Sequence, residues 1–475
     1  MREILVVDLD HTLLKSDMLL ESFWSVFGRD WRSPFRSILA LAQGKAVLKR
    51  YLAETAQVDV KTLPYDPQII AYIEAWRAAG GRTALVTASD ETIARDIAEH
   101  LKLFDEVQGS DGAENLKGER KARFLIETYG EKQFSYMGDS KADLAVWAYA
   151  KRAITVNLSE DLRTRVASVA AEAEHLSTSR PTSGAYLEAL RPHQWIKNAL
   201  VFVPMLAAHQ IGTTTLFLSL MAFVAFCLIA SSAYVLNDLL DMEADRAHWR
   251  KRLRPFAAGR IAVASGAWMT AGLLLAGLLI ALLIGPVFLT VMISYYVLTT
   301  AYSLNLKRRI IIDICVLAGL YTVRIVAGGT ATGLLPSAWL LAFSIFFFLS
   351  LAAVKRQAEL VDNSRRGKLK VLGRGYLVDD LPIISMISIS SGYAAVLVMA
   401  LYVNSPAVTE LYATPEALWG VCIVLLYWIT RTVFVANRGN MHDDPVIYAT
   451  RDRISQICFG VICLFVLVGA LLQWT

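Results

Sequence analysis

The sequence predicts two domains of different fold class. About residues 1–170 are expected to form an α/β domain with a parallel sheet, and residues 191–475 an all-α membrane domain. Three observations support this prediction. A short continuous apolar segment near the N-terminus ends in carboxylates, as central parallel strands of α/β enzymes do. Long apolar segments recur from about residue 193, and the loops between them alternate in charge. Residues 171–190 are predicted to be a linker, because part of the segment is rich in Ser, Thr, Pro and Gly.

Nine apolar segments are predicted to cross a membrane. An α-helix needs about 20 mostly apolar residues to span the hydrocarbon core of a bilayer. The first segment is short and contains Lys197. The nine segments lie at residues 194–210, 214–236, 263–284, 286–304, 310–332, 336–354, 381–403, 415–436 and 454–474.

Loop charges predict the orientation of these spans. Lys and Arg are dense after the second, fourth, sixth and eighth spans and absent from the intervening loops. Cytoplasmic loops carry the excess of Lys and Arg in membrane proteins. We therefore expect a multi-pass protein of a bacterial-type inner or plasma membrane, with the N-terminal domain in the cytoplasm and the C-terminus on the opposite side.

Composition excludes other classes of protein. The net charge of +5 follows from these loops and from residues expected to bind anions, so nucleic acid is not an expected partner. All five cysteines lie in apolar spans without a Cys-x-x-Cys pair, and we interpret them as small hydrophobic residues. No signal peptide is expected, because Met1 is followed almost at once by the first strand. The sequence leaves homo-oligomer formation open.

Four separated motifs in the N-terminal part point to phosphate chemistry. The first strand ends in Asp-x-Asp-x-Thr, which contains Asp8 and Asp10, and a second strand, residues 83–86, ends at Thr87. A third strand, residues 134–137, runs into Gly-Asp-Ser-Lys-Ala-Asp, which contains Asp139 and Asp143. A lysine candidate, Lys117, lies between the second and third strands. Ligands of open α/β sheets bind at the carboxyl ends of strands, where these side chains fall.

In this order the motifs resemble the haloacid dehalogenase (HAD) superfamily of phosphatases, over about residues 1–160. The resemblance implies a Rossmann-like parallel sheet with a small helical cap between Leu13 and about Pro64. It also implies that Asp8 is the nucleophile, that Asp10 is the general acid/base and that Thr87 and Lys117 bind phosphoryl oxygens. The implied Mg²⁺ ligands are Asp8, Asp10, Asp139 and Asp143. A carboxylate attacks a phosphoryl group only when cations neutralise their repulsion. A degenerate domain kept for packing or regulation is the alternative.

The run from Asn237 to Arg246 is the most informative stretch of the membrane part. It follows an apolar segment, and carboxylates at the end of such a segment are costly to desolvate. Asn237, Asp241 and Asp245 are spaced four residues apart, so they share one face of a continuing helix. Such oxygen-rich groups suit Mg²⁺ shared with a diphosphate. A solvated acidic helix end is the alternative, which the basic residues at 250–254 disfavour.

Three motifs in the membrane part resemble the UbiA superfamily of intramembrane prenyltransferases, over about residues 185–475. They are Arg-Pro-x-Gln-Trp-x-Lys-Asn at 191–198, the acidic run at 237–246, and Lys-Arg-x-x-Glu at 355–359. Within the superfamily they are most similar to the decaprenyl-phosphate phosphoribosyltransferases. Members that move a prenyl group carry a second Asp-x-x-x-Asp motif, whereas here Leu317 follows Asp313 at that spacing. This departure favours a sugar diphosphate over a prenyl diphosphate as donor.

The resemblance implies roles for the polar residues at the ends of the spans. The expected Mg²⁺ ligands on the diphosphate are Asp238, Asp241 and Asp245, with Asn237 orienting it. The expected anion-binding residues are Lys251, Arg254 and Lys307. Candidates for the lipid phosphate or the ribose 5-phosphate are Lys197, Lys355 and Arg356. Tyr302 either binds a phosphate or belongs to an interfacial tyrosine belt. For each basic residue the alternative is a purely topological role.

The expected activity is the transfer of 5-phosphoribose from phosphoribosyl diphosphate to a polyprenyl phosphate, with release of pyrophosphate. The HAD-like domain is expected to remove the 5-phosphate of the product, and a role in cell wall biosynthesis is expected. One alternative is transfer of a polyprenyl group from its diphosphate to an aromatic or other acceptor. A second alternative is a non-catalytic HAD-like scaffold anchored in the membrane.

Overall fold

A computed structural model describes residues 3–56, 58–110, 115–178, 182–370, 373–441 and 444–471. The chain divides into two compact units. The first contains residues 1–190 together with 235–269, and the second contains residues 191–234 together with 270–475. The acidic run at 237–246 therefore packs with the N-terminal residues, whereas the sequence assigned it to the membrane domain.

A six-stranded parallel sheet forms the centre of the first unit, in the order β3-β2-β1-β4-β5-β6. The central strand β1 is fully buried, which explains its continuous apolar sequence. The strands are β1 Ile4–Val7, β2 Arg82–Asp90, β3 Glu106–Ser110, β4 Phe134–Gly138, β5 Arg152–Val156 and β6 Glu172–Leu176.

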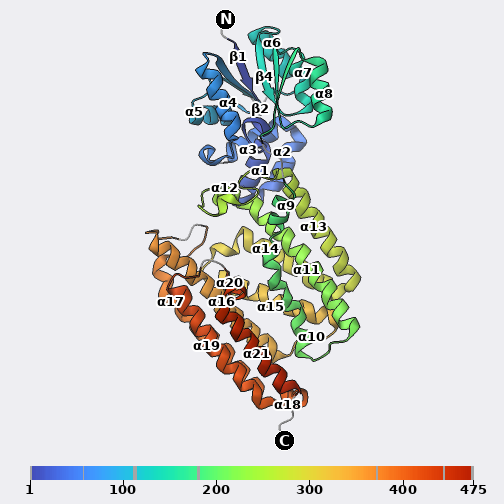
Figure 1. Ribbon diagram of the computed structural model, residues 1–475, viewed down its shortest axis with the longest axis vertical. Helices are drawn as coiled ribbons and strands as arrows, with labels where there is room; N and C mark the ends of the chain where they lie inside the picture. The colour runs from blue at the N-terminus through green and yellow to red at the C-terminus, as the bar shows by residue number, and fades with distance from the viewer. Residues whose placement is uncertain are drawn as a thin grey trace. The chain divides into compact units, whose positions relative to one another are not determined.

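Helices cover both faces of this sheet, as Figure 1 shows. Alternate residues of a strand face opposite sides, so Leu5 and Val7 pack in one layer and Ile4 and Val6 in the other. The first layer contains α4 and α5, and the second contains α6, α7 and α8. These helices are α4 Pro67–Ala78, α5 Glu91–Leu101, α6 Glu119–Tyr129, α7 Leu144–Trp147 and α8 Glu160–Val169.

Three further helices fill the interval between β1 and β2, where the sequence predicts a helical cap. They are α1 Met18–Arg29, α2 Ser33–Gln43 and α3 Lys45–Thr55. The side chain of Asp17 caps α1 by accepting a hydrogen bond from the backbone N–H of Leu20, at 3.1 Å. A proline at the start of α2 is compatible with the first helical turn.

The predicted linker at 171–190 is folded over most of its length. It contains β6 at the edge of the sheet and helix α9 Ser183–Leu190. Two short elements of the acidic and basic segment, α12 Met242–Arg246 and the 3₁₀ turn η5 Lys251–Leu253, complete the first unit.

The second unit is helical. Two of its long helices, α11 and α13, continue into the first unit at one end. The α-helices are α10 Val203–Ala207, α11 Thr213–Leu240, α13 Val263–Ile284, α14 Pro286–Leu304, α15 Ile312–Thr332, α16 Ala338–Arg365, α17 Leu381–Val403, α18 Pro406–Leu411, α19 Leu418–Asn437, α20 Pro445–Arg451 and α21 Arg453–Leu471. The 3₁₀ elements are η4 Pro192–Phe202, η6 Leu306–Arg308, η7 Val378–Asp380 and η8 Pro415–Ala417.

Eight helices in the described part of the chain are long and apolar enough to cross a membrane. The sequence predicts nine, and the difference is the segment at 194–210. This segment forms η4 followed by the short helix α10, instead of one long α-helix. The described residues thus contain eight candidate α-helical spans, and a membrane crossing by the segment at 194–210 stays a prediction.

Candidate functional site

The first candidate site lies at the carboxyl end of β1. Asp8 follows this strand directly, and its backbone N–H donates to the carbonyl of Met137 at the end of β4, at 2.9 Å. Its carboxylate accepts a hydrogen bond from the backbone N–H of Leu9, at 2.8 Å. The ammonium group of Lys121 lies 2.9 Å from the same oxygen. A carboxylate held by its own turn and next to a buried cation suits nucleophilic attack on a phosphoryl group.

Asp8 also belongs to a close group of three carboxylates. Oxygens of Asp8, Asp139 and Asp143 lie within 4.8 Å of one another, the one such group that the described residues contain. Asp143 is oriented by the hydroxyl groups of Tyr136 and Ser140, at 2.8 and 2.7 Å. Burial, then the charges of Asp8 and Asp143, raise the pKa of Asp139 to about 8. An all-oxygen set whose members repel one another fits a Mg²⁺ ion.

Asp10 lies in the turn after β1, outside this group of three carboxylates. Its carboxylate accepts hydrogen bonds from the backbone N–H of Met18 and the hydroxyl of Ser89, both at 2.8 Å. Burial, then the charge of Asp17, raises the pKa of Asp10 to about 7. A carboxyl with such a pKa can donate and accept a proton near neutral pH. Because Asp10 is also not part of the close group of carboxylates, it fits the acid/base role better than that of a metal ligand.

The lysine beside Asp8 is Lys121, whereas the sequence motif points to Lys117. Lys117 is exposed in the loop before α6, and Lys121 is buried in the first turn of that helix. The two lysines are only four residues apart in the sequence, so spacing alone does not discriminate between them. Thr87, predicted at the end of the second strand, lies within β2 and is buried, and its hydroxyl accepts a hydrogen bond from the backbone N–H of Ser89, at 3.0 Å.

A cap residue that the sequence analysis missed also reaches this site. Lys49, in α3, donates hydrogen bonds to the carbonyl of Ala88, at 2.6 Å, and to the side chain of Asn115, at 3.0 Å. Burial lowers the pKa of Lys49, and the charges of Asp10 and Asp17 oppose this effect. No local motif marks the residue, because its role depends on how the cap folds over β2.

The second candidate site is the acidic loop, defined as residues 237–254 of the first unit. The guanidinium of Arg254 bridges two buried carboxylates, those of Asp238 at 3.1 Å and Asp245 at 2.5 Å. Lys251 lies 4.0 Å from Asp245. Burial raises the pKa of Asp245 to about 6, against the opposing charge of Arg254. The structure thus brings together four of the predicted residues, and Asn237 and Asp241 lie half-buried in the same segment.

This loop offers the oxygen ligands that Mg²⁺ prefers, but their arrangement differs from that around Asp8. Arg254 occupies the position between Asp238 and Asp245, so their oxygens do not form a close group with Asp241. The residues present do not show a closed set for a metal. Mg²⁺ at this loop stays a prediction.

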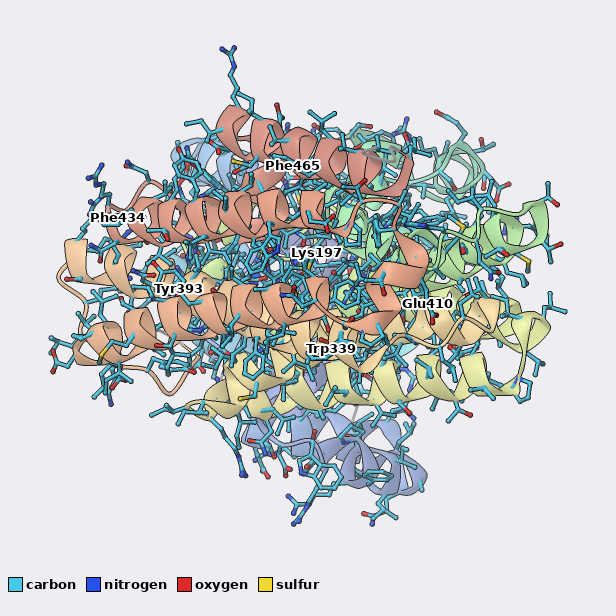
Figure 2. The ribbon with its side chains drawn as sticks, turned by 90° about the horizontal axis from the view of Figure 1, so that it is seen from below. Lys197, Trp339, Tyr393, Glu410, Phe434 and Phe465 are labelled. Atoms are coloured by element: carbon cyan, nitrogen blue, oxygen red, sulfur yellow. The ribbon has the colours of Figure 1, made fainter. Side chains whose placement is uncertain are left out.

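A third candidate site lies in the second unit around Asp444, which sequence reasoning missed. One oxygen of Asp444 lies 2.8 Å from the ammonium of Lys197 and 3.1 Å from that of Lys355. The other accepts a hydrogen bond from the hydroxyl of Tyr321, at 3.0 Å. Burial opposes ionisation, but the two lysines hold the pKa of Asp444 well below its usual range. Figure 2 shows Lys197 among the helices, in agreement with its burial.

A second cluster of this unit surrounds Asp313, the remaining half of the incomplete motif. Asp313 is completely buried and accepts hydrogen bonds from Arg356, Arg374 and Tyr302, each at 2.8 Å. Arg356 also pairs with Glu359. One terminal nitrogen of Arg356, Nη2, is buried and has no hydrogen-bond partner among the described residues. A buried donor without an acceptor is costly, and an anionic ligand would satisfy it.

Two further basic residues are buried in the second unit. Arg324 donates to the side chain of Asn198, at 2.9 Å, and lies over the rings of Phe226 and Tyr295. Lys307, a predicted anion-binding residue, is buried in η6. Arg324, Lys197, Lys355 and Arg356 are thus candidates for binding anions inside the helical unit.

The chain matches two protein-family models. Residues 199–472 match the model of the UbiA prenyltransferase family, and residues 5–147 match that of the haloacid dehalogenase-like hydrolases. The uncharacterized protein y4nM of Sinorhizobium fredii is 39% identical over 460 residues, 95% of this chain and 88% of that protein.

Two named relatives match a smaller part of the chain. The nodulation protein NoeC of Azorhizobium caulinodans is 40% identical over 273 residues, 58% of this chain and 89% of that protein. The decaprenyl-phosphate phosphoribosyltransferase of Mycolicibacterium smegmatis is 33% identical over 307 residues, 61% of this chain and 95% of that protein.

Proposed function

From the premise that this chain belongs to the UbiA prenyltransferase family and carries a haloacid dehalogenase-like hydrolase domain, we propose a bifunctional membrane enzyme. The membrane part transfers 5-phosphoribose from phosphoribosyl diphosphate to a polyprenyl phosphate, releasing pyrophosphate. The hydrolase domain then removes the 5-phosphate from the lipid-linked product. The named activity of the Mycolicibacterium relative supports the first step.

The hydrolase step uses the residues around Asp8. An oxygen of Asp8 attacks phosphorus and forms an aspartyl-phosphate, while Asp10 protonates the leaving sugar oxygen. Asp10 then takes a proton from the water that cleaves the aspartyl-phosphate. Lys121 balances charge on the phosphoryl oxygens. Mg²⁺, held by Asp8, Asp139 and Asp143, would supply the remaining charge neutralisation.

The transfer step uses the basic residues that the sequence predicts to bind anions. We infer that Arg254 and Lys251, which pair with Asp238 and Asp245, bind the diphosphate. Lys197, Lys355 and Arg356 bind the phosphate groups of the lipid acceptor or of the ribose. As the carbon–oxygen bond to pyrophosphate breaks, the anomeric carbon gains positive charge, and an oxygen of the lipid phosphate attacks it from the opposite face.

The surroundings of Asp313 support phosphoribosyl diphosphate over a prenyl diphosphate as the donor. In a prenyl-transferring enzyme the second acidic motif would offer two carboxylates at this position. Here the second carboxylate is replaced by Leu317, and Asp313 is bound by Arg356, Arg374 and Tyr302. A carboxylate that accepts three hydrogen bonds is poorly placed to hold a metal, and Nη2 of Arg356, which has no hydrogen-bond partner among the described residues, can donate to an anionic ligand.

The loop charges support a cytoplasmic N-terminal unit and a C-terminus on the opposite side. In this topology η4 and α10 make the first crossing, and the eight long helices make the others. Both steps then act on one side of the membrane, where the tethered hydrolase domain meets the new product at high effective concentration.

Incubation of the purified protein with labelled phosphoribosyl diphosphate and decaprenyl phosphate tests both steps. The wild type is expected to yield decaprenyl-phosphoryl ribose and free phosphate, and Asp8→Asn to accumulate the 5-phosphate form, as read by mass spectrometry. Equal release of phosphate by both proteins would overturn the hydrolase step. Pyrophosphate release from a prenyl diphosphate, but not from phosphoribosyl diphosphate, would overturn the choice of donor.

A further inference from the structure

Helix α2 of the cap has its apolar side chains on the wrong face for a soluble domain. Its buried residues are Ser33, Ser37 and Ala40, small residues at spacings of four and three. Its large apolar side chains face outward: Phe35 is 64% exposed, Ile38 63% and Leu39 66%. A solvent-facing helix normally buries its large apolar residues and exposes its polar ones, so this inversion requires a partner for the outer face.

The apolar face continues into the preceding turn, and arginines border it. Trp31 is 56% exposed, and the guanidinium of Arg32 lies 5.3 Å from the centre of its ring. Arg36, one turn further, is exposed and pairs with Asp30 at 3.3 Å. Trp, Phe and Leu on one face, with Arg at its border, is the composition of helices that lie in the interface of a bilayer. Arginine at the border is complementary to anionic headgroups.

Contacts within the first unit place the start of α2 near a membrane boundary. Gly28, at the end of α1, approaches the last residue of α11 so closely that an added Cβ would lie 2.5 Å from the carbonyl oxygen of Leu240. The next residue, Arg29, makes two hydrogen bonds of 2.8 Å with the carboxylate of Glu243. Because α11 is a membrane-spanning helix, its end marks the boundary, and α2 begins five residues after Gly28.

We propose that α2 is an interfacial membrane helix, with Trp31, Phe35, Ile38 and Leu39 inserted at the level of the lipid headgroups. The occupant of its outer face is the bilayer that the rest of the chain spans. Helices α1, α2 and α3 lie together at one end of the sheet in Figure 1. The contact of α2 with the bilayer therefore holds the whole cap against the lipid surface. The proposal is independent of the reaction that the hydrolase domain catalyses.

The test uses full-length protein labelled with 5-fluorotryptophan, in nanodiscs that each contain one copy of the chain. The chain has eleven tryptophans, and Trp31→Phe identifies the ¹⁹F resonance of Trp31 by its loss. Trp76→Phe identifies a control on α4, whose indole N–H donates to the carbonyl of Arg82. Dissolved oxygen concentrates in lipid, and a gadolinium chelate stays in water.

The resonance of Trp31 is expected to shift with oxygen and to resist the chelate, more strongly when phosphatidylglycerol is added to phosphatidylcholine. The resonance of Trp76 is expected not to show the oxygen-induced shift of a residue in lipid. Broadening of the Trp31 signal by the chelate would overturn the proposal. Protection of Trp31 from the chelate that appears only in discs with two copies of the chain would also overturn it, because a second chain would then cover the outer face of α2.

A second variant separates this proposal from the proposed function. Phe35→Glu with Ile38→Glu is expected to lower hydrolysis of a phosphorylated lipid at least tenfold and to change hydrolysis of p-nitrophenyl phosphate less than twofold. Val169→Glu, at an exposed apolar residue of α8, is the matched control. If neither phosphate ester is hydrolysed by the wild type, the proposed function fails while the ¹⁹F result stands. If both activities of the double variant equal those of the wild type, α2 does not hold the cap on the membrane.

Discussion

The carboxylate of Glu21 accepts two hydrogen bonds from the guanidinium of Arg246, a residue 225 positions later in the chain, at 2.7 and 3.0 Å. Glu21 lies in the cap helix α1, and Arg246 ends the acidic run. Ser16 also donates to Glu21, and the Nε of Arg246 donates to the carbonyl of Ala257. The first turn of α1 supplies the N–H that binds Asp10, so one helix contacts both the hydrolase site and the acidic loop.

Loss of Glu21 is expected to destabilise the first unit strongly. The two side chains are only 4% and 6% exposed, and Glu21→Ala leaves a buried guanidinium without its partner, which costs about 3–5 kcal/mol. Arg29→Ala is the matched control, because it breaks a pair between the same two elements that is 39% exposed on each side. That pair is worth about 0–1 kcal/mol. Thermal unfolding in detergent measures both, and equal losses would contradict the prediction.

Lys121→Ala is expected to reduce hydrolysis of p-nitrophenyl phosphate about a hundredfold or more, because Lys121 is the cation beside Asp8. Lys117→Ala removes an exposed side chain and is expected to change the rate less than threefold. The comparison of kcat for the two variants decides between the lysine that the motif indicates and the one that the fold selects. A larger loss for Lys117→Ala would return the role to that residue.

Asp313→Ala is expected to destabilise the second unit by about 3–5 kcal/mol, because Arg356 and Arg374 lose their buried counter-ion. Asp362→Ala, in the same helix as Arg356, breaks an exposed pair with Arg366 and should have almost no effect. The thermal midpoints of the two variants measure the difference. An undiminished midpoint for Asp313→Ala would show that the arginines find other partners.

Acid is expected to weaken the cluster around Asp444. The pKa of Asp444 is lower in the folded protein than the value of about 3.9 expected in an unfolded chain. The lysine pairs therefore contribute stability that is present above about pH 4 and is lost as pH falls below that value. Asp444→Asn removes this contribution. The difference in thermal midpoint between wild type and Asp444→Asn should shrink as pH falls below about 4, and a difference that grows over this range would contradict the prediction.

The sequence predicted the parallel sheet, the cap and the helical membrane part because each depends on a local pattern. A buried central strand is continuously apolar, a membrane helix needs about 20 apolar residues, and short motifs at strand ends mark the hydrolase site. Asp8, Asp139 and Asp143 meet because the carboxyl ends of β1 and β4 adjoin in the sheet.

What the sequence by itself determined is therefore the fold class of each part, the family likeness and the type of residue at each site. The tertiary structure decided which members of those sets meet: Lys121 instead of Lys117 on Asp8, Arg254 between two carboxylates, and Asp444 between two lysines. It also joined Glu21 to Arg246 and turned the apolar face of α2 outward. Strands and spans are set by neighbours in the chain, whereas these contacts depend on how distant elements pack, which residue spacing does not encode.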